Sequence, residues 1–271
     1  MKLTSSTIQR LTSQYGDWVL ITGATSGIGR AMALAFGEAG FRLVITGRRE
    51  SLLNELGTHL FDQYQVETIP LVGDLSTAEG VAQLKAETAH LPIGIAVLNA
   101  GYGTSGSFLN SELDQEINML RLNCESVLSL SHHFANQFQS RKSKGAIVLM
   151  SSMVSFQGVP NAAHYAATKA YVQSLGEALA VEWKPLGIDV LCAAPGPVQS
   201  GFAERADMKM DMALSPQQVA VPIIRAIGKK TTLLPGALTK LLVYNLRMMP
   251  RWLKVRIMGK VMGGFTQHQV A

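Results

Sequence analysis

Cysteine, charge and long apolar runs are all scarce in this 271-residue chain. Its two cysteines, Cys124 and Cys192, stand among apolar neighbours without the spacing of metal ligands, so we expect reduced core thiols and no metal site. No apolar run is long enough to span a bilayer, and the start MKLTSSTIQR has no apolar segment behind its lysine. These absences argue against a membrane-spanning helix and a cleaved secretory signal, and they favour a cytoplasmic protein.

Acidic residues are also absent after Asp211, where basic residues continue. Residues 236–271 form a basic extension to a domain that covers residues 1–235, with two expected helical pieces at 237–248 and 251–262 separated by Pro250. Two interpretations stay open: the second piece packs on the domain or a partner subunit, or it lies on an anionic membrane surface with Trp252 at the interface. No recognition motif accompanies the charge, so we expect no nucleic-acid binding.

Apolar, β-rich segments alternate with longer helical stretches along residues 18–234. With 47% hydrophobic and only 16% charged residues, the chain is typical of a compact protein, and the alternation predicts a single α/β domain with a doubly wound parallel sheet. Strands are expected at 18–22, 42–46, 67–71, 93–98, 146–150 and 188–193, with a doubtful seventh at 231–234. Helices are expected at 27–39, 49–61, 77–90, 111–139, 162–184 and 216–227.

A glycine-rich turn joins the first expected strand to the first of these helices. The residues expected to contact a cofactor there are Gly23, Thr25, Ser26, Gly27, Ile28 and Gly29. Without Cβ atoms the backbone can turn tightly and approach phosphate oxygens, while free N–H groups at the helix start supply positive potential. The G-x-x-x-G-x-G spacing in a strand-turn-helix setting predicts a site for a dinucleotide pyrophosphate, against the alternative of a turn without a ligand.

Two arginines, Arg48 and Arg49, follow the second expected strand, whose end lies beside the adenosine ribose in such folds. An acidic residue at this place would bind the ribose 2′-OH of NAD, whereas guanidinium groups suit a 2′-phosphate, with Arg30 a candidate third. The pattern favours NADP. The alternative for Arg49 is a solvated helix face.

The helix at 162–184 carries Tyr165 and Lys169, which lie four residues apart on one face. A neighbouring ammonium stabilises a phenolate, so we expect the pKa of Tyr165 to be lowered and its hydroxyl to exchange a proton with a carbonyl oxygen as hydride arrives. Such a pair alone is usually structural. Ser152, just past the fifth strand at the carboxyl edge of the sheet, favours a catalytic reading.

Together these stretches resemble the short-chain dehydrogenase/reductase family. The resemblance covers roughly residues 18 to 202 in the family's order. The matching elements are TGATSGIG, Asp74 in GDL, Asn99-Ala100-Gly101, Asn123, Ser152, Tyr165-Ala-Ala-Thr-Lys169 and Pro195-Gly196-Pro197-Val198.

The resemblance implies a Rossmann-type fold and a role for each matching residue. Ser152 would polarise the substrate oxygen, Tyr165 would transfer the proton, Lys169 would bind the nicotinamide ribose and Asn123 would support a proton relay. Further cofactor contacts are implied for Asp74, Leu75, Asn99, Ala100, Gly101, Pro195, Gly196 and Val198. The helices 111–139 and 162–184 resemble the family's subunit contacts, which implies a homo-oligomer.

Several positions keep a structural alternative. Asn123 and Asp74 could simply bond nearby backbone, and Tyr102 could either contact substrate or pack. His164 lies about 100° from the Tyr165 face of its helix, which favours a rim or interface position. Residues 199–214, with Met208, Met210 and Met212, fit a mobile lid over an apolar pocket or an irregular loop without function.

The leading functional hypothesis is an NADP(H)-dependent oxidoreductase that interconverts a carbonyl and an alcohol, with a hydrophobic ketone or acyl-type substrate. A catalytically silent dinucleotide-binding or sensing protein is the alternative, and the intact set of Ser152, Tyr165 and Lys169 argues against it. A third hypothesis is a membrane-targeting adaptor that depends on residues 251–271.

Overall fold

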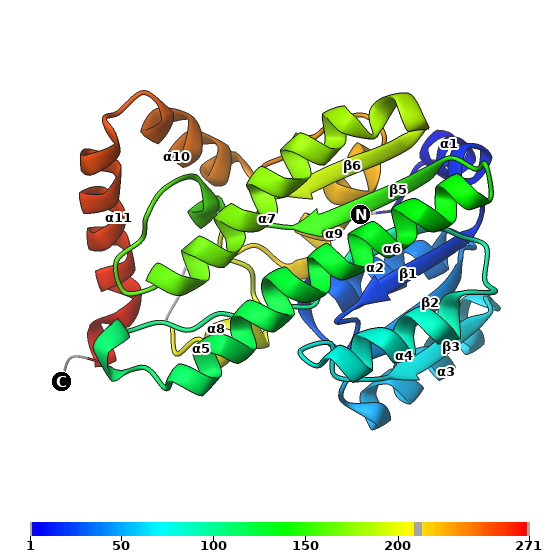
Figure 1. Ribbon diagram of the computed structural model, residues 1–271, viewed down its shortest axis with the longest axis horizontal. Helices are drawn as coiled ribbons and strands as arrows, with labels where there is room; N and C mark the ends of the chain where they lie inside the picture. Colours follow the sequence, from blue (N-terminus) through cyan, green and yellow to red (C-terminus); the bar gives the residue numbers. More distant parts are fainter. Residues whose placement is uncertain (1, 209–212, 270–271) are drawn as a thin grey trace.

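A single twisted sheet of parallel strands forms the centre of the molecule (Figure 1). The computed structural model describes residues 2–208 and 213–269, and within them seven strands follow the order β3-β2-β1-β4-β5-β6-β7. Their bounds are β1 Trp18–Thr22, β2 Arg42–Gly47, β3 Thr68–Val72, β4 Ile93–Leu98, β5 Gly145–Met150, β6 Ile188–Ala193 and β7 Thr232–Leu233. The strand order reverses direction between β1 and β4, which is where open sheets of this kind bind ligands.

The strands form where β-branched and aliphatic residues can be covered on both faces. All residues of β1, β4 and β5 are buried, as the continuous apolar runs predict. The expected strands at 18–22, 93–98 and 188–193 are confirmed to the residue. The edge strand expected at 67–71 lies one residue later, and the doubtful seventh strand contains only two residues.

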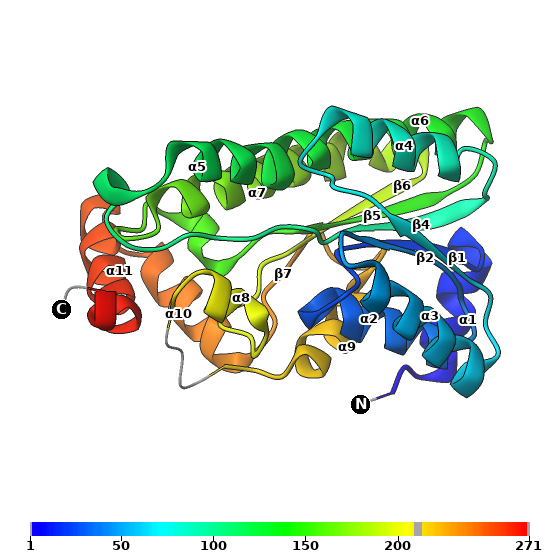
Figure 2. The same ribbon diagram turned by 90° about the horizontal axis from the view of Figure 1, so that it is seen from below.

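Helices cover both faces of the sheet (Figure 2). On one face lie α4 Ala78–Thr88, α5 Leu113–Leu120, α6 Ser126–Ser140 and α7 Ala163–Glu182. The other face carries α1 Ser5–Tyr15, α2 Gly27–Glu38, α3 Glu50–Tyr64 and α9 Pro216–Ala226. The short helix α8, Gly201–Arg205, follows β6. The predicted single-domain, doubly wound α/β fold is therefore confirmed.

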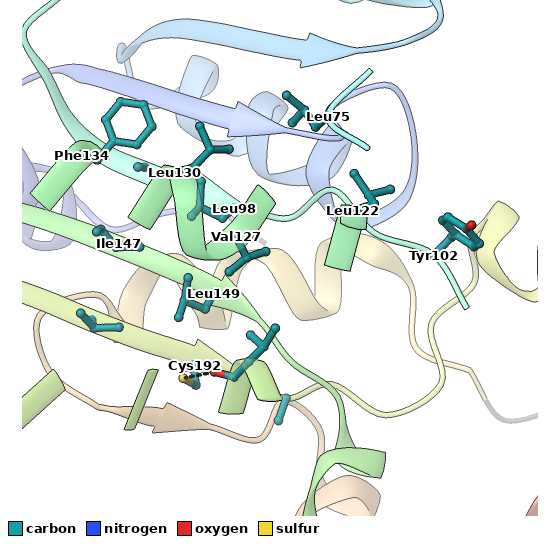
Figure 3. Packing of buried hydrophobic residues seen from close by; sticks show 14 of the residues in the cluster. Leu75, Leu98, Tyr102, Leu122, Val127, Leu130, Phe134, Ile147, Leu149 and Cys192 are labelled. Carbon is teal, nitrogen blue, oxygen red and sulfur yellow. Dashed lines mark hydrogen bonds between the residues drawn. The ribbon is translucent and has the colours of Figure 1, made fainter. Parts of the chain in front are cut away.

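Apolar side chains of the sheet and of its covering helices form a core on each face. Figure 3 shows one of them, where Leu98, Ile147 and Leu149 of the strands pack against Leu130 and Phe134 of α6. Cys124 and Cys192 are free and buried, as predicted.

Besides the short helix α8, which was not predicted, two longer helical segments differ clearly from the sequence prediction. The helix expected at 111–139 is α5 and α6 joined by a π-helical turn at Arg121–Glu125, and such turns redirect side chains at functional sites. Helix α1 was not predicted. Its signal was present, because Thr7, Leu11 and Tyr15 repeat every four residues and are buried, and the Thr4 side chain accepts a hydrogen bond from the Thr7 N–H.

Two C-terminal helices, α10 Ala237–Arg247 and α11 Arg251–Thr266, lie beyond the carboxyl ends of the strands (Figure 1). Met258 and Met262 of α11 are buried, and Gly259 faces Pro160, where an added Cβ would come within 3.1 Å. Helix α11 therefore packs on the domain, which is the first of the two interpretations of this segment. Among the residues described, no helix combines the length and apolarity needed to cross a bilayer.

Candidate active site

One large cavity of about 1080 Å³ opens at the carboxyl edge of the sheet, beside the point where the strand order reverses. It is lined by eighteen of the twenty residues that sequence analysis assigned to the site, and the two exceptions are Gly29 and Asn123. Because these residues come from positions 23 to 198, the fold rather than any local motif brings them together.

The glycine turn forms the floor at one end of the cavity. Gly23 and Gly27 have φ values of +67° and +55°, a conformation that favours glycine. Gly29 faces away from the cavity, and a Cβ there would overlap the Gly23 carbonyl oxygen, so its role is to let the turn close. Helix α2 begins at Gly27 without a side-chain cap from Ser26, which leaves its first N–H groups facing the cavity.

A set of hydrogen bonds that the sequence did not predict holds this turn against the end of β4. The Thr22 Oγ1 accepts hydrogen bonds from the N–H groups of Asn99 and Ala100, both at 2.9 Å. The Asn99 side-chain amide in turn donates to the Thr22 and Gly23 carbonyls at 2.9 and 3.3 Å. Asn99 therefore shapes the turn, and these hydrogen bonds join the ends of β1 and β4.

Guanidinium groups gather at the adjoining end of the cavity. Arg48 pairs with Asp74 at 3.5 Å, and Arg49 donates to the Thr25 hydroxyl at 3.2 and 2.6 Å. The predicted third group is wrong: Arg30 does not line the cavity and lies 3.9 Å from Glu55.

Arg205 of α8 reaches this same region, and sequence analysis did not identify it. Its guanidinium carbon stands 3.8 Å from the centre of the Tyr102 ring. Burial, together with repulsion from Arg48, lowers the pKa of Arg205. Partial burial raises the pKa of Asp74. Hydrogen bonds from Ser76 and the positive charge of Arg48 outweigh this effect and hold that pKa below its usual value. This end of the cavity therefore attracts anions.

Tyr165, Lys169 and Ser152 meet midway along the cavity. The Lys169 ammonium lies 5.9 Å from the centre of the Tyr165 ring and donates a hydrogen bond to the Met150 carbonyl at 2.8 Å. The Ser152 hydroxyl lies close enough to the Tyr165 phenol to lower its pKa, and the Ser151 hydroxyl donates to the Lys169 carbonyl at 3.1 Å, which fixes α7 against the end of β5. All three functional groups are on buried residues that line the cavity.

The pKa of the phenol departs from our expectation. Burial raises the pKa of Tyr165 to about 12, and the hydrogen bond with Ser152 only partly opposes it. Burial also lowers the pKa of Lys169 to about 8. The expected lowering of the phenol pKa is therefore wrong for this geometry, since the ammonium is committed to Met150 rather than to the phenol oxygen.

Asn123 lies in the π-helical turn and holds the backbone beside the cavity. Its amide oxygen accepts from the Tyr102 N–H at 3.1 Å, while its nitrogen donates to the Tyr102 carbonyl at 2.8 Å and to the Thr168 hydroxyl at 3.0 Å. Asn123 therefore makes the hydrogen bonds to nearby backbone that its structural alternative predicts. A Cβ on Gly101 would lie 2.8 Å from the Asn123 Oδ1 and 3.3 Å from the Lys169 Nζ, so both groups approach that glycine.

Removing these hydrogen bonds should destabilise the fold. For Asn123→Leu we expect a loss of about 2–5 kcal/mol in the free energy of unfolding, because two buried backbone groups of Tyr102 lose their partner. Urea denaturation measures this loss. Thr168→Val keeps both hydrogen bonds to Tyr102 and should lose less; equal losses for the two variants would contradict this reading.

The remaining candidates differ in their position relative to the cavity. The Tyr102 hydroxyl donates to the Gln115 carbonyl at 2.7 Å, so its ring packs at the cavity wall (Figure 3). The His164 ring is hydrogen bonded with the Glu116 carbonyl at 3.1 Å and does not line the cavity. Of the proposed lid methionines, Met208 lines the cavity, whereas Met210 and Met212 lie outside the described residues.

The opposite end of the cavity is apolar, and its wall comes from the segment 199–214, one interpretation of which was a lid, and from C-terminal helices that were not assigned to the site. Phe202 of α8 packs on Tyr165, with ring centres 5.3 Å apart. Leu242 of α10 and Met258, Val261 and Phe265 of α11 complete the wall.

Further contacts secure α11 in this position. The Gln269 side chain, just beyond it, donates to the Ser105 hydroxyl at 3.0 Å and to the Asp207 carbonyl at 2.6 Å. The C-terminal helices therefore enclose the space beside the phenol.

Comparison with known proteins agrees with this geometry. Residues 17–211 match the family model described as short chain dehydrogenase. A 7β-hydroxysteroid dehydrogenase of Clostridium sardiniense is 28% identical over 231 residues, covering 84% of this chain and 88% of the relative. A very-long-chain 3-oxoacyl-CoA reductase of Mus musculus is 29% identical over 246 residues, covering 89% and 78%.

Solved structures share the fold over most of the chain. One, from a study of 7β-hydroxysteroid dehydrogenase stereoselectivity, has a TM-score of 0.83 at 27% identity and covers 92% of this chain and 98% of its own. Another, a short-chain dehydrogenase from Sphingobium yanoikuyae in complex with NADPH, has a TM-score of 0.76 at 28% identity and covers 80% and 86%. This chain therefore belongs to the short-chain dehydrogenase family and is an oxidoreductase that acts on CH–OH groups.

Proposed function

We propose that this protein is an NADP(H)-dependent reductase that converts the carbonyl group of a bulky hydrophobic ketone or acyl-type substrate to an alcohol. The observation that carries the proposal is the juxtaposition, in one cavity, of a cationic end, a buried phenol with its serine and lysine, and an apolar end. The cationic end fits the phosphate groups of the cofactor, and the phenol with its serine and lysine fits the reacting carbonyl. The apolar end fits the body of the substrate.

The residues at the cationic end fit a dinucleotide phosphate. The turn at Gly23 and Gly27 presents backbone where a side chain would otherwise fill the space, and the start of α2 offers free N–H donors. Arg48, Arg49 and Arg205 add positive charge suited to a 2′-phosphate. The related structure from Sphingobium yanoikuyae contains NADPH, which supports the same preference here.

The chemistry follows from the groups beside the phenol. A bound nicotinamide cofactor supplies the hydride. Ser152 donates a hydrogen bond to the carbonyl oxygen, and Tyr165 donates its proton to that oxygen. With its pKa raised to about 12, the phenol keeps its proton at neutral pH, as the acid in a carbonyl reduction must. The Lys169 ammonium, held by the Met150 carbonyl, offers a further donor to a ribose hydroxyl.

The apolar end sets the substrate class. It is lined by Phe202, Leu242, Met258 and Phe265. Burial of a hydrocarbon substrate against these side chains is favourable. The two kinds of relative act, by their names, on hydroxysteroids and very-long-chain 3-oxoacyl thioesters, which are large and mostly apolar.

A panel of ketones of increasing size tests the proposal. We expect kcat/KM with NADPH, followed by loss of its absorbance, to rise by roughly fourfold per added buried methylene, since each contributes about 0.8 kcal/mol. The panel runs from acetone through bicyclic ketones to a steroid ketone and a long-chain 3-oxoacyl thioester. Equal efficiency for small and large ketones would contradict the substrate class, and NADPH binding without turnover of any ketone would favour the silent binding protein.

The rate of ketone reduction should depend on pH through the protonation of Lys169. Burial lowers the pKa of Lys169 to about 8, so its positive charge is present below that pH and is lost above it. We expect log kcat to fall above about pH 8 by about one unit per pH unit. In Lys169→Arg the charge persists and the fall should disappear from this range; a fall that stays at the same pH would assign it to another group.

We also propose that copies of the chain associate through α6 and α7. Leu128, Tyr171 and Val181 are large apolar residues that these helices leave exposed. Light scattering should give a mass above that of one chain, and Val181→Glu should lower it.

A further inference from the structure

The outer face of α10 carries an apolar strip that nothing in the described structure covers. Its members, Leu238, Leu241, Tyr244 and Met248, recur every three or four residues along one side of the helix, and Trp252 at the start of α11 continues the strip. Leu241 is 61% exposed, Tyr244 58%, Met248 87% and Trp252 60%. A contiguous exposed strip of this kind marks a contact surface.

Exposed cations flank the apolar strip. Lys240, Arg247 and Arg251 lie among its members, and Arg256 stands 5.3 Å from the Trp252 ring centre. Within residues 2–208 and 213–269, none of the ion pairs involves a basic residue of α10 or α11. The sequence offers no acidic residue after Asp211, and the segment 153–161, on which both helices pack, has none either.

The apolar strip and its unpaired cations together indicate what binds to this face. A second copy placed by two-fold symmetry would bring the same face against itself, so cations would oppose cations with no acidic residue between them. A protein core would not accept these charges unpaired. An anionic lipid surface satisfies both features, because headgroups attract the cations, acyl chains receive the leucine and methionine side chains, and tyrosine and tryptophan suit the interface.

The apolar strip also adjoins the cavity. Leu238 is 44% exposed at the surface and lines the cavity as well, and Leu242, one turn further along α10, lines it from within. The mouth of the apolar end therefore opens beside the apolar strip.

We propose that the outer face of α10, with Trp252, docks on the surface of an anionic phospholipid membrane, so that a hydrophobic substrate enters the cavity directly from lipid. The contact is peripheral: α11 stays packed on the domain, and only α10 and Trp252 meet the lipid. This corrects the version of the hypothesis in which α11 itself lies on the membrane. The docking does not depend on which cofactor the enzyme uses, and entry of substrate from lipid rests on the proposed hydrophobic substrate class.

Co-sedimentation of the full chain with vesicles tests it. We expect binding to vesicles of phosphatidylcholine with phosphatidylserine and not to phosphatidylcholine alone. Reversing Lys240, Arg247 and Arg251 to Glu should weaken binding by at least about a hundredfold, since each basic residue contributes roughly fivefold. The matched control reverses Lys144, Lys229 and Lys230, exposed residues at the opposite edge of the sheet, and should retain most of the binding.

A second pair of substitutions, Leu241→Ser with Met248→Ser, removes the apolar part of the strip and should also abolish binding. Both side chains are exposed, so NADPH affinity should persist and show that the variant is folded. The proposal fails if the wild type stays in solution with anionic vesicles or if the reversed variant binds like the control. It fails as well if the serine variant lowers the mass of the protein without lipid, because that result would make this face a subunit interface.

Discussion

Replacing Tyr165 by phenylalanine is expected to lower kcat for ketone reduction by about 10²–10⁴-fold, the usual contribution of a positioned acid. The substitution removes only the hydroxyl, so the ring keeps its packing on Phe202, 5.3 Å away between centres. Ser152 and Lys169 are held by the backbone of β5 and its continuation, through Val154 N–H and the Met150 carbonyl, and should stay in place. The Kd for NADPH should therefore change little while turnover is lost.

Tyr171→Phe is the matched control for this variant. Tyr171 lies on the same helix α7 but points outward, with 40% of its surface exposed, and does not line the cavity. The same chemical change there should leave kcat at the wild-type level. If Tyr165→Phe reduced ketones as fast as Tyr171→Phe, the phenol would not be the acid and the proposed chemistry would have to be abandoned.

Replacing Arg48 by alanine is expected to raise the Kd for NADPH by about 10- to 150-fold and to change the Kd for NADH far less. A charged hydrogen bond of this kind contributes about 1.5–3 kcal/mol, which corresponds to that range. The change also frees Asp74, now 3.5 Å from Arg48, so that its carboxylate repels a 2′-phosphate. Fluorescence titration with each cofactor measures both constants.

Arg30→Ala provides a control with the same change in charge. Arg30 follows the glycine turn but lies outside the cavity beside Glu55, so neither Kd should move. Arg205→Ala should weaken binding of NADPH as Arg48→Ala does, because its guanidinium group stands over Tyr102 at the same end. Equal losses for NADPH and NADH in Arg48→Ala would show that this residue does not recognise the 2′-phosphate.

Features that depend on short stretches of chain were predictable from sequence. The apolar run WVLIT followed by glycines identifies β1 and its turn, and the four-residue spacing of Tyr165 and Lys169 places them on one helical face. Their meeting with Ser152 followed from the position of Ser152 at the carboxyl edge of the sheet together with the family resemblance.

Features that depend on distant segments were not predictable. The pKa of Tyr165 is set by burial and by the commitment of Lys169 to Met150, neither of which can be deduced from spacing. Gln269 meets Ser105 across 164 positions, and α11 becomes the wall of a cavity whose floor is formed by residues 23–29. Arg205 belongs to a five-residue helix without a recognisable pattern, so only its position over Tyr102 shows where it lies.

The central claim is that hydride passes from a nicotinamide to a bulky ketone held beside Tyr165. Reduction of the best ketone of the panel with NADPH that carries deuterium at both C4 positions of the nicotinamide, followed by mass spectrometry of the product, tests it most directly. We predict an alcohol that carries one deuterium on the former carbonyl carbon, formed at full rate by the wild type and about 10²–10⁴-fold more slowly by Tyr165→Phe. An alcohol without deuterium, or equal rates for the two proteins, would contradict the account.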